Sequence, residues 1–482
     1  MVVDSQTAFS GGINLCFGRW DTWNHPLTDY SQLFPGKDYW NERVHCICEV
    51  NTPFKDKFDR RSVPRMPWHD VQQMVVGQPA HDLARHFVQR WNSVAWQGMP
   101  QVTPLLLPPP DIVPEPFDTG TCEYQVLRSL GMWSSAHEQS IQDAYVALIE
   151  ESEHFVYIEN QFFSTSTEVD SEEIQNLIGE ALFTRALNAY LDNQGWRAFI
   201  LIPLLPGFEG SIGDPDATNL RTVCECQYRS ISQGPNSIFE RLRRLGVEPE
   251  SYIIFLSLRK WDRLPDGMLC TEQVYIHSKC MIVDDRVAII GSANINDRSM
   301  LGTRDSELAV CVRDTQLINS RMAGKPWKAG RFAHSLRVRL MREHAGLNLD
   351  ELDSIEGSLQ PGNLFFQHMR GPDHRARLTG STISSCGFTD PLDKCFVTQW
   401  LGIARENTRI FREVFHCQPD DEVRDWEDYY QYEAQQKVCD VGAEEKLQGV
   451  TGNLVLFPTR WMCSLEHWRR KRDFLGPLAI YS

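Results

Sequence analysis

A histidine and a lysine two positions apart give the clearest chemical signal in this sequence. His277 and Lys279 flank Ser278, and on an extended strand both side chains project from the same face. An imidazole beside a fixed positive charge suits a phosphate diester, because the imidazole can attack phosphorus or protonate a leaving group while the ammonium holds the non-bridging oxygens. The pair therefore indicates chemistry at a phosphate diester that requires no metal or other cofactor.

The residues that follow this pair have a regular spacing. Asp284 comes after four intervening residues, and Gly291-Ser292-Ala293-Asn294 begins after six more. Gly291 and Ser292 allow close approach of the backbone, while the side-chain amide of Asn294 can donate to a phosphate oxygen. An isolated H-x-K triplet is weak evidence, since a histidine on a strand is more often an ordinary core or surface residue. Within this longer pattern the triplet becomes a strong prediction of a phosphate site.

The start of the chain repeats this segment 280 positions earlier. Residues 1–4 align with residues 281–284, and the same six-residue gap then leads to the sequence GGIN at residues 11–14. The positions that would hold the first histidine and lysine fall before Met1, so we expect half of a two-part site to lie outside this sequence. A repeat of this kind predicts two lobes related by a pseudo-two-fold axis, with the first lobe incomplete.

Helix and strand patterns alternate around the motif and predict the scaffold that positions it. In chain order we expect a helix at 135–151, a strand at 155–158, a helix at 174–182 and a strand at 198–202. Ser135 and Glu138 have the spacing of a capping box at the start of the first helix, and Pro203 ends the last strand. Each copy of the repeat predicts a hairpin, with turns at Asp4-Ser5 and Asp284-Asp285. This alternation favours an α/β fold with helices around a mixed sheet.

Turn-rich stretches divide the chain. The expected parts are a remnant of the first lobe at 1–103, a Pro-rich connection at 104–120, the second lobe at 121–345, an irregular surface insert at 346–390, and a C-terminal part of the second lobe at 391–482. A chain of 482 residues is long enough to bury two large cores.

The composition limits the partners and the location of the chain. A formal charge of −16 argues against a protein that coats nucleic acid, which needs a broad basic surface. We find neither an apolar run of about 18 residues nor a secretion signal, and the 14 cysteines follow no disulfide or zinc framework. We therefore expect a cytoplasmic protein with reduced thiols that meets anionic partners through local basic patches. The candidate patches are Arg241 with Arg243 and Arg244, Arg337 with Arg339 and Arg342, and residues 468–472.

The last of these patches has the composition of a membrane contact. Trp468 precedes four basic residues, and Phe474-Leu475 follows them. Such a patch suits the surface of an anionic leaflet, where each cation contributes about 1 kcal/mol. A solvated helix face is the alternative for all three patches.

His277-Ser278-Lys279, with Asp284 and the sequence at 291–294, resembles the HKD signature of the phospholipase D superfamily. Other stretches resemble its eukaryotic, phosphatidylcholine-hydrolysing branch, and they cover most of residues 1–345. These stretches are Gly18-Arg19-Trp20-Asp21, Pro67-Trp68-His69-Asp70-Val71, Ala84-Arg85-His86-Phe87, residues 157–163, residues 206–210 and residues 227–231. Members with nuclease activity share the H-x-K triplet but are not expected to carry this set.

The resemblance implies a fold and a reaction. The fold has two pseudo-two-fold-related lobes, each a mixed β-sheet flanked by helices. The reaction converts phosphatidylcholine to phosphatidic acid and choline through a phosphatidyl-histidine, with the nucleophile usually assigned to the first motif. His277 is then the general acid and later the general base. Lys279, Ser292 and Asn294 would bind the phosphate, together with Asn14 from the first lobe.

The resemblance also suggests residues that support the site. Glu307 resembles the family's carboxylate partner for the second histidine, with a surface position as the alternative, and Asp29 is a candidate partner for the first histidine. Asp284 belongs to the catalytic motif, although its place at a hairpin turn favours a structural role. For Glu159 and Gln161 we weigh substrate contact and structural hydrogen bonding equally.

The family implies a phospholipid membrane surface as partner, peripheral location on membranes, and no nucleic-acid partner. It leaves room for phosphoinositide activation and for a regulatory small GTPase. Because one H-x-K triplet is missing, we expect little or no phospholipase activity and poor solubility from these residues alone. Two alternatives stay open: a non-catalytic lipid-binding or regulatory protein, and an HKD nuclease or phosphodiesterase.

Overall fold

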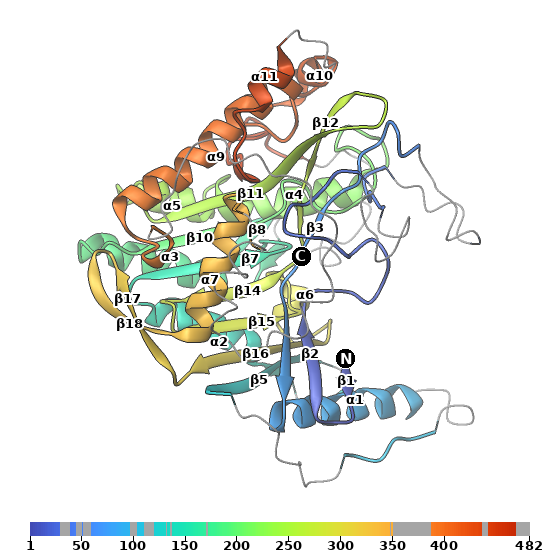
Figure 1. The fold of residues 1–482 in the computed structure, drawn as a ribbon, viewed down its shortest axis with the longest axis vertical. Helices are drawn as coiled ribbons and strands as arrows, with labels where there is room; N and C mark the ends of the chain where they lie inside the picture. Colours follow the sequence, from blue (N-terminus) through green and yellow to red (C-terminus); the bar gives the residue numbers. More distant parts are fainter. Residues whose placement is uncertain are drawn as a thin grey trace.

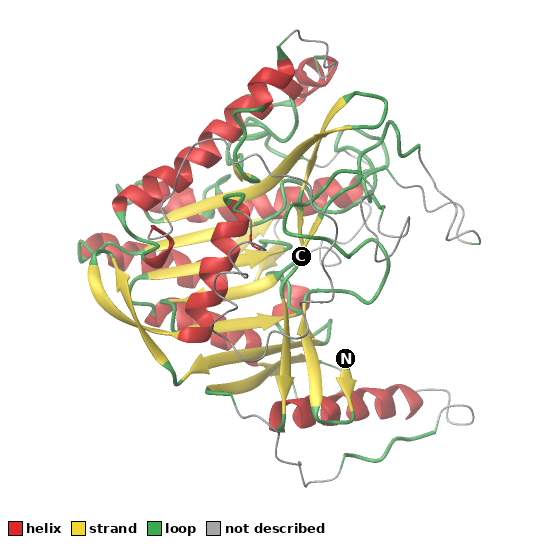
Figure 2. Ribbon diagram, in the orientation of Figure 1, coloured by secondary structure: helices red, strands yellow, loops and turns green. Residues whose placement is uncertain are grey.

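The structure is a computed structural model of the chain (Figures 1 and 2). The residues that it describes are 1–28, 39–44, 51, 59–96, 104–109, 120–131, 133–134, 137–169, 172–347, 349, 387–435 and 442–468. Within these ranges a large mixed sheet has helices on both of its faces (Figure 2), which confirms the predicted α/β class.

Ten strands form the sheet of the second lobe. In sheet order they are β12 (Leu269–Gln273), β11 (Ile253–Arg263), β10 (Arg197–Leu201), β7 (Phe155–Asn160), β14 (Lys279–Val283), β15 (Val287–Gly291), β16 (Glu307–Asp314), β5 (Cys122–Leu130) and β6 (Glu138–Gln139), and β19 (Leu454–Leu456) pairs with β11. β7, β10 and β11 are parallel, whereas β14 is antiparallel to β7. Every residue of β7, β14 and β15 is buried, so both faces of the sheet are covered.

Two hydrophobic cores lie on opposite faces of this sheet. Successive strand residues point to opposite faces, so Val156 and Ile158 enter one core while Phe155 and Tyr157 enter the other. The first core contains α2 (Ser140–Glu151), α3 (Ile178–Leu191), α4 (Thr218–Ile231) and α5 (Ile238–Arg244), and the second contains α7 (Arg331–His344) and α9 (Lys394–Phe415) (Figure 1). Smaller elements are β8 (Thr167–Val169), β9 (Glu172–Ile174), α6 (Asp297–Met300), β17 (Leu317–Met322), β18 (Lys325–Gly330), α10 (Trp426–Ala434) and α11 (Ala443–Leu447).

The described part of the first lobe is a small sheet with one long helix. β1 (Val2–Val3), β2 (Thr7–Gly11) and β4 (Gln72–Val76) pair antiparallel, and α1 (Gln78–Trp96) packs beside them. Ala8, Val75 and Leu83 share a core with Val310 and Val312 of β16. β3 (Trp68–His69) pairs instead with β13 (Tyr275–Ile276) of the second lobe. The two lobes therefore meet directly beside the H-x-K triplet.

The repeat in the sequence is also a repeat in the structure. The positive φ values at the two turns are +53° at Asp4, +55° at Ser5, and +53° at both Asp284 and Asp285. A β-turn with two such central residues is of type I′, which suits hairpins. The registers agree as well, because Val3 pairs with Thr7 as Val283 pairs with Val287. Both predicted hairpins are confirmed.

Two helices begin later than the sequence pattern indicates. α2 begins at Ser140, because the two residues before it pair with β5 as strand β6. The predicted capping box is therefore wrong: Glu138 belongs to that strand, and Ser135 lies outside the described residues. α3 begins at Ile178, because Ile174 is the last residue of β9. The predicted strands at 155–158 and 198–202 are confirmed as parts of β7 and β10.

Two of the predicted basic patches differ from expectation. Arg337 is 0% exposed and donates to both carboxylate oxygens of Asp285, so it cannot bind an external anion. Trp468 is 1% exposed and packs against Tyr228 and Trp461. The predicted membrane contact through Trp468 is therefore wrong, and the basic residues that follow it lie outside the described residues.

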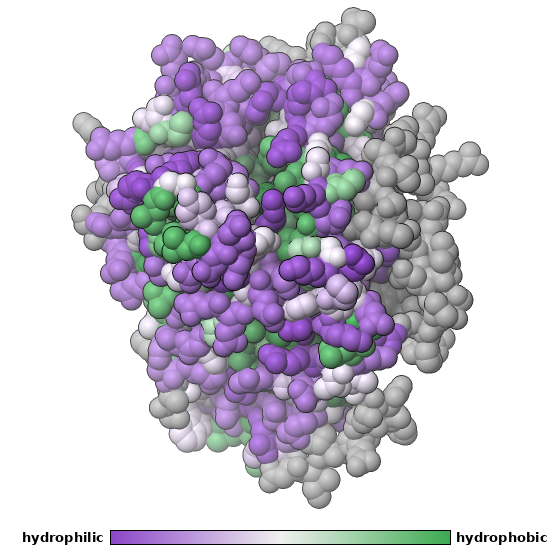
Figure 3. All heavy atoms as spheres, turned by 90° about the vertical axis from the view of Figure 1, so that its left-hand side faces the viewer, coloured by the Kyte–Doolittle hydropathy of each residue, from purple (hydrophilic) through white to green (hydrophobic). Residues whose placement is uncertain are grey.

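The described surface is mainly hydrophilic on the face that Figure 3 shows, where apolar residues form only small separate groups. In the described ranges, no helix combines the length and the apolar sequence that crossing a bilayer requires. Most of the predicted insert, residues 351–386, lies outside these ranges, whereas residues 104–109 of the Pro-rich connection form a described loop without helix or strand.

Candidate active site

His277 lies at the junction of the two lobes, between β13 and β14. Its backbone N–H donates to the carbonyl of His69 (2.8 Å), which continues the pairing of β13 with β3. Its Nδ1 lies 2.9 Å from Oδ2 of Asp70 in the first lobe. Because an ionised carboxylate only accepts hydrogen bonds, Nδ1 carries a proton and Nε2 is left for a substrate. A first-lobe carboxylate thus fixes the tautomer of the second-lobe histidine.

The surroundings of His277 favour its neutral form. Its side chain is 10% exposed, and burial lowers the pKa of the imidazole, although the hydrogen bond to Asp70 acts in the opposite direction. The ring centroids of Trp68 and His277 lie 4.8 Å apart, and Cζ of Arg19 lies 3.9 Å from the centroid of the Trp68 ring. An imidazole that releases its proton readily is suited to general acid–base chemistry.

Lys279 is buried next to His277 and is held by two acceptors. Its Nζ donates to Oε1 of Gln161 (2.9 Å) and to the carbonyl of His277 (2.5 Å). Gln161 is fixed in turn, because its Nε2 donates to the hydroxyl of Tyr275 (3.0 Å). Burial lowers the pKa of Lys279 to about 8, so the ammonium is charged at neutral pH. These contacts support the structural reading of Gln161 and leave Lys279 as a cation for an anionic ligand.

The carboxylate that we predicted as the partner of His277 lies elsewhere. Glu307 accepts hydrogen bonds from Oγ of Ser292 (2.6 Å) and Oγ of Ser299 (2.7 Å). Its predicted pairing with His277 is therefore wrong, and Asp70 takes that place. Burial raises the pKa of Glu307, although the two hydroxyls act in the opposite direction.

The pseudo-two-fold repeat explains this exchange. The equivalent register pairs are Gly11 with Gln72 and Gly291 with Ala309. Asp70 and Glu307 each lie two residues before the second member of these pairs, so the two carboxylates are equivalent. Since Asp70 of the first lobe serves His277 of the second, symmetry places Glu307 beside the first-lobe position that corresponds to His277.

The predicted phosphate ligands differ in how they are engaged. Oδ1 of Asn294 is buried and has no hydrogen-bond partner among the described residues. The hydroxyl of Ser292 donates to a carboxylate, as described above, so it supports that carboxylate and is not a free donor. Asn14 is exposed, two residues after Gly12, where a Cβ would lie 2.6 Å from the carbonyl of His277. Asn14 and Asn294 stay the predicted amide ligands of a phosphate, each through its Nδ2 donor, because an amide oxygen can only accept.

Asp284 fits the structural alternative. Its carboxylate accepts hydrogen bonds from the backbone N–H groups of Glu153 (2.6 Å), His154 (2.8 Å) and Phe155 (2.8 Å). These bonds tie the hairpin turn to the start of β7. Because the carboxylate of Asp284 is engaged by three backbone N–H groups, the structure argues against a catalytic role for it. Asp29, the candidate partner of the first histidine, lies outside the described residues.

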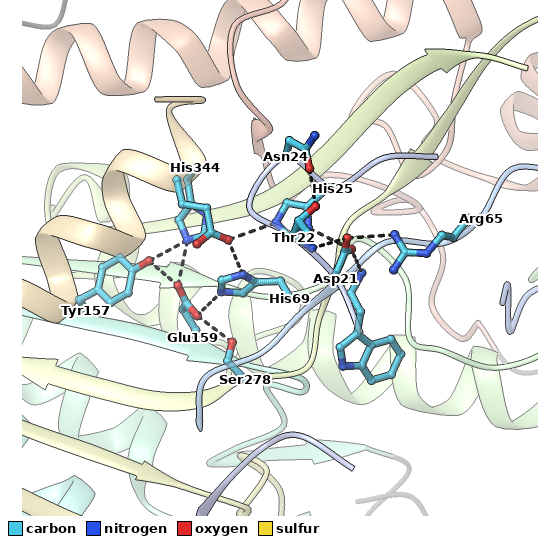
Figure 4. A network of polar contacts seen from close by, with 12 residues as sticks. Asp21, Thr22, Asn24, His25, Arg65, His69, Tyr157, Glu159, Ser278 and His344 are labelled. Atoms are coloured by element: carbon cyan, nitrogen blue, oxygen red, sulfur yellow. Dashed lines mark hydrogen bonds and ion pairs between the residues drawn. The ribbon is translucent and has the colours of Figure 1, made fainter. Parts of the chain in front are cut away.

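Glu159 is completely buried near the end of β7 and accepts four hydrogen bonds (Figure 4). Its Oε2 accepts from Nε2 of His69 (2.8 Å) and from Oγ of Ser278 (2.7 Å). Its Oε1 accepts from Nε2 of His344 (2.9 Å) and from the hydroxyl of Tyr157 (2.6 Å). A saturated, buried carboxylate supports structural hydrogen bonding rather than substrate contact.

The network continues into the first lobe through Glu343 of α7. Oε1 of Glu343 lies 2.9 Å from Nδ1 of His69 and 3.1 Å from Nε2 of His25. Nδ1 of His25 lies 3.1 Å from Asp21, which also pairs with Arg65 at 3.0 Å. We call the set formed by Asp21, His25, Arg65, His69, Tyr157, Glu159, Ser278, Glu343 and His344 the interlobe network. Sequence reasoning did not connect these residues, because they are spread over more than 300 positions. Asp21, His69, Tyr157, Glu159 and Ser278 lie in the family stretches or the H-x-K triplet, whereas His25, Arg65, Glu343 and His344 carried no sequence signal.

The interlobe network should make stability depend on pH. Burial alone would lower the pKa values of His25 and His69, but their carboxylate partners outweigh it and raise both. Burial would also raise the pKa of Glu159, but its imidazole partners hold it well below the usual value. The histidine contribution is complete below about pH 6.5 and is lost as pH rises through the raised pKa values, whereas the carboxylate contribution is complete above about pH 4.5.

We therefore expect the free energy of unfolding to fall as pH rises above about 6.5, through the raised pKa values of His25 and His69, and we expect His69→Gln to reduce this fall. Urea denaturation at each pH measures both effects. His137→Gln is the matched control, because His137 is exposed and lies outside the network. Identical pH profiles for the His69 variant and the wild type would contradict the expectation.

Comparisons with known proteins place this site in a family. A family model described as Phospholipase D matches residues 3–359. Phospholipase D1 of Schizosaccharomyces pombe is 52% identical over 376 residues, which cover 74% of this chain and 28% of that protein. Phospholipase D1 of Saccharomyces cerevisiae is 44% identical over 437 residues (86% of this chain, 25% of that protein), and Phospholipase D1 of Homo sapiens is 38% identical over 444 residues (89% and 38%).

The chain thus spans between 25% and 38% of the length of these three relatives. The family-model match includes the H-x-K triplet, its partner Asp70 and every strand of the ten-stranded sheet except β19. The chain belongs to the phospholipase D family.

Proposed function

We propose that this chain is part of a phospholipase D that hydrolyses phosphatidylcholine to phosphatidic acid and choline. The observation that carries the proposal is the hydrogen bond between Asp70 and His277, because it joins the two lobes at the H-x-K triplet and fixes the imidazole. Family membership supports the reaction class. The substrate, the intermediate and the need for a second triplet are our inferences.

In the proposed reaction, an imidazole of the first lobe attacks phosphorus, and the bond from phosphorus to the choline oxygen breaks on the opposite side. His277, as imidazolium, donates its Nε2 proton to that departing oxygen, while Asp70 stabilises the positive charge. Water then attacks the phosphatidyl-histidine and gives its proton to Nε2 of His277. The first imidazole leaves, and phosphatidic acid is released. By the pseudo-two-fold symmetry, Glu307 would orient the first imidazole.

Lys279 supports this reaction by holding the non-bridging oxygens of the phosphate. Its charge is close to His277 and faces little competition from solvent, because the side chain is 4% exposed. A cation in such a site stabilises the charge that develops on the phosphate oxygens. Asn14 and Asn294 would add amide donors from the two lobes.

We expect Lys279→Met to weaken the binding of inorganic phosphate about 10- to 100-fold, since a hydrogen bond to a charged group contributes about 1.5 to 3 kcal/mol. Because burial lowers the pKa of Lys279 to about 8, the advantage of the wild type over the variant should shrink as pH rises above 8. Isothermal titration calorimetry measures both effects. Lys328→Met is the matched control, because Lys328 is exposed on β18. Equal phosphate affinity in the two variants would count against the site.

Two other functions predict different results. An HKD nuclease, once supplied with a first triplet, would cleave single-stranded DNA faster than phosphatidylcholine. A non-catalytic lipid-binding protein would bind vesicles without turnover even then.

We also propose that the substrate is met at a membrane surface. Choline-release assays on vesicles with and without phosphoinositides or a small GTPase would test the two regulatory predictions.

A further inference from the structure

His69 and Asp70 are consecutive residues of the first lobe that contact different parts of the second lobe. Asp70 holds Nδ1 of His277. His69 turns into the interlobe network, where its two ring nitrogens lie 2.8 Å from Glu159 and 2.9 Å from Glu343. Glu159 belongs to β7 and Glu343 to α7, so a single imidazole ties β3 to a strand and a helix of the second lobe.

Charge balance indicates that His69 is a cation. Each ring nitrogen faces an acceptor, and an imidazole can donate from both nitrogens only when it is protonated. The hydrogen-bonded network holds three carboxylates, namely Asp21, Glu159 and Glu343, against one guanidinium, Arg65. Two protonated imidazoles balance these charges. Both ring nitrogens of His25 and of His69 face a carboxylate, whereas Nδ1 of His344 has no partner among the described residues, so His25 and His69 are the two that carry the protons. Since uncompensated charges are costly to bury, the protonated form is favoured.

Other titratable groups surround the two imidazoles. The titratable and charged groups that face them are Asp21, Arg65, Tyr157, Glu159, Glu343 and His344, while Lys260 acts on Asp21 and Cys280 acts on Glu159. Burial alone would lower the pKa of His69, but Glu159 and Glu343 hold it well above its usual value.

The same side chains could be read as metal ligands, since His69, Glu159 and His344 have ligand atoms close together. The contacts favour hydrogen bonds instead. Donor and acceptor atoms are 2.8 to 2.9 Å apart in pairs, which is the ordinary length of a charge-assisted hydrogen bond. A divalent cation would add charge to a network that protons already balance.

The network contacts the H-x-K triplet at two places. Ser278, the middle residue of the triplet, donates to Glu159. The carbonyl of His69 accepts from the backbone N–H of His277, while the adjacent Asp70 binds the imidazole of that residue. A shift of β3 would therefore move the acceptor of Nδ1 together with a backbone partner of the same histidine.

We propose that His69 is a positioning residue: as a cation bonded to Glu159 and Glu343, it fixes β3 so that Asp70 keeps the proton of His277 on Nδ1 and leaves Nε2 for the substrate. This inference rests on the proposed role of His277 as acid and base. Loss of the cation would leave two buried carboxylates facing each other across β3, and their repulsion would displace the strand.

The tautomer of His277 is the quantity to measure. Nitrogen-15 spectra of histidine-labelled protein report which ring nitrogen is protonated, and the His277 signal is assigned by its loss in His277→Gln. In the wild type, above the pKa of His277, we expect the proton on Nδ1. In Asp70→Asn and in His69→Gln we expect this preference to be lost. The double variant should match Asp70→Asn alone, because His69 acts through Asp70.

His25→Gln is the matched control, since His25 also lies between two carboxylates but is not adjacent to Asp70. It should lower stability without changing the tautomer of His277. A folded His69→Gln variant that keeps the wild-type tautomer would overturn the proposal. So would a tautomer change of equal size in His25→Gln, because the effect would then be general.

A second variant tests the proposal if His69→Gln does not fold. Glu343→Gln keeps the shape of its side chain and removes one of the two charges that raise the pKa of His69. His69 should then lose its proton at a lower pH, so the loss of the His277 tautomer should move to lower pH than in the wild type. An unchanged pH for this loss would overturn the proposal. These spectra report the position of the His277 proton and do not depend on turnover. A negative result here can therefore be told apart from a failure of the proposed phospholipase activity.

Discussion

The 482-residue polypeptide, mixed with phosphatidylcholine vesicles, is expected to release choline on the order of 10⁴- to 10⁶-fold more slowly than phospholipase D1 of Schizosaccharomyces pombe under the same conditions. The reason is chemical. The sequence contains one H-x-K triplet, at 277–279, and one imidazole cannot attack phosphorus and protonate the opposite oxygen in the same step. Loss of a covalent nucleophile corresponds to roughly 5 to 8 kcal/mol of activation free energy.

The repeat suggests a direct rescue of this activity. A copy of residues 274–280 placed before Met1 restores the spacing of the second lobe in the first. The added strand would continue β1, because the carbonyl of Met1 already accepts from the N–H of Phe9 (2.8 Å) at the end of that strand. We expect the extended chain to release choline faster than the original, and His277→Ala in the extended chain to abolish the gain.

One outcome would contradict the need for two triplets. If the original polypeptide released choline at a rate within about tenfold of the relative, and if His277→Ala abolished that release, a single imidazole would suffice. The second condition excludes contamination by another lipase. Choline release is measured directly in both cases. The fraction of protein that sediments with the vesicles shows whether a low rate reflects weak membrane binding or slow chemistry.

Asp285→Asn is expected to lower the free energy of unfolding by about 3 to 5 kcal/mol, since it leaves a buried guanidinium without its counter-charge. Arg337 and Asp285 are both 0% exposed and share two hydrogen bonds between the turn of the second hairpin and α7. Burial would raise the pKa of Asp285, but Arg337 outweighs it and keeps the carboxyl ionised. Urea denaturation measures the loss as a lower midpoint at unchanged slope.

A neighbouring surface pair supplies the control for this prediction. Arg286 and Glu153 lie 2.9 Å apart with side chains 42% and 58% exposed. Glu153→Gln should therefore cost no more than about 1 kcal/mol. Adding Arg337→Leu to Asp285→Asn should recover part of the loss, because no buried charge then remains and asparagine tolerates the positive φ of this turn position. Equal effects of Asp285→Asn and Glu153→Gln would show that burial of the pair does not matter.

Local patterns explain why much of the fold could be predicted. The hairpin turns were recognisable because short polar residues that tolerate positive φ stand between apolar strands, and both copies fold in the same register. β7 and β10 were recognisable as continuous apolar runs. The start of α2 was not, because the choice between a capped helix and strand β6 depends on pairing with β5, a neighbour that a local window does not contain.

The candidate site also contains residues that local sequence predicts and residues that it does not. His277 and Lys279 were predicted from their own spacing, and the structure places them next to each other where β13 ends and β14 begins, with Nζ of Lys279 donating to the carbonyl of His277. Glu307 was assigned to the wrong histidine, because the carboxylate that holds His277 comes from Asp70 of the other lobe. Nothing near His277 in the sequence marks Asp70, which approaches it from 207 positions away.

By itself, the sequence determined the type of chemistry, the family and the duplicated hairpins, because residue identity and short spacing specify them. Only the tertiary structure decided that Asp70 serves His277, that Arg337 and Trp468 are buried, and that His69 joins the lobes. The physical reason is distance: hydrogen bonds and ion pairs act over a few ångströms, so their partners are fixed only when segments hundreds of residues apart are packed together.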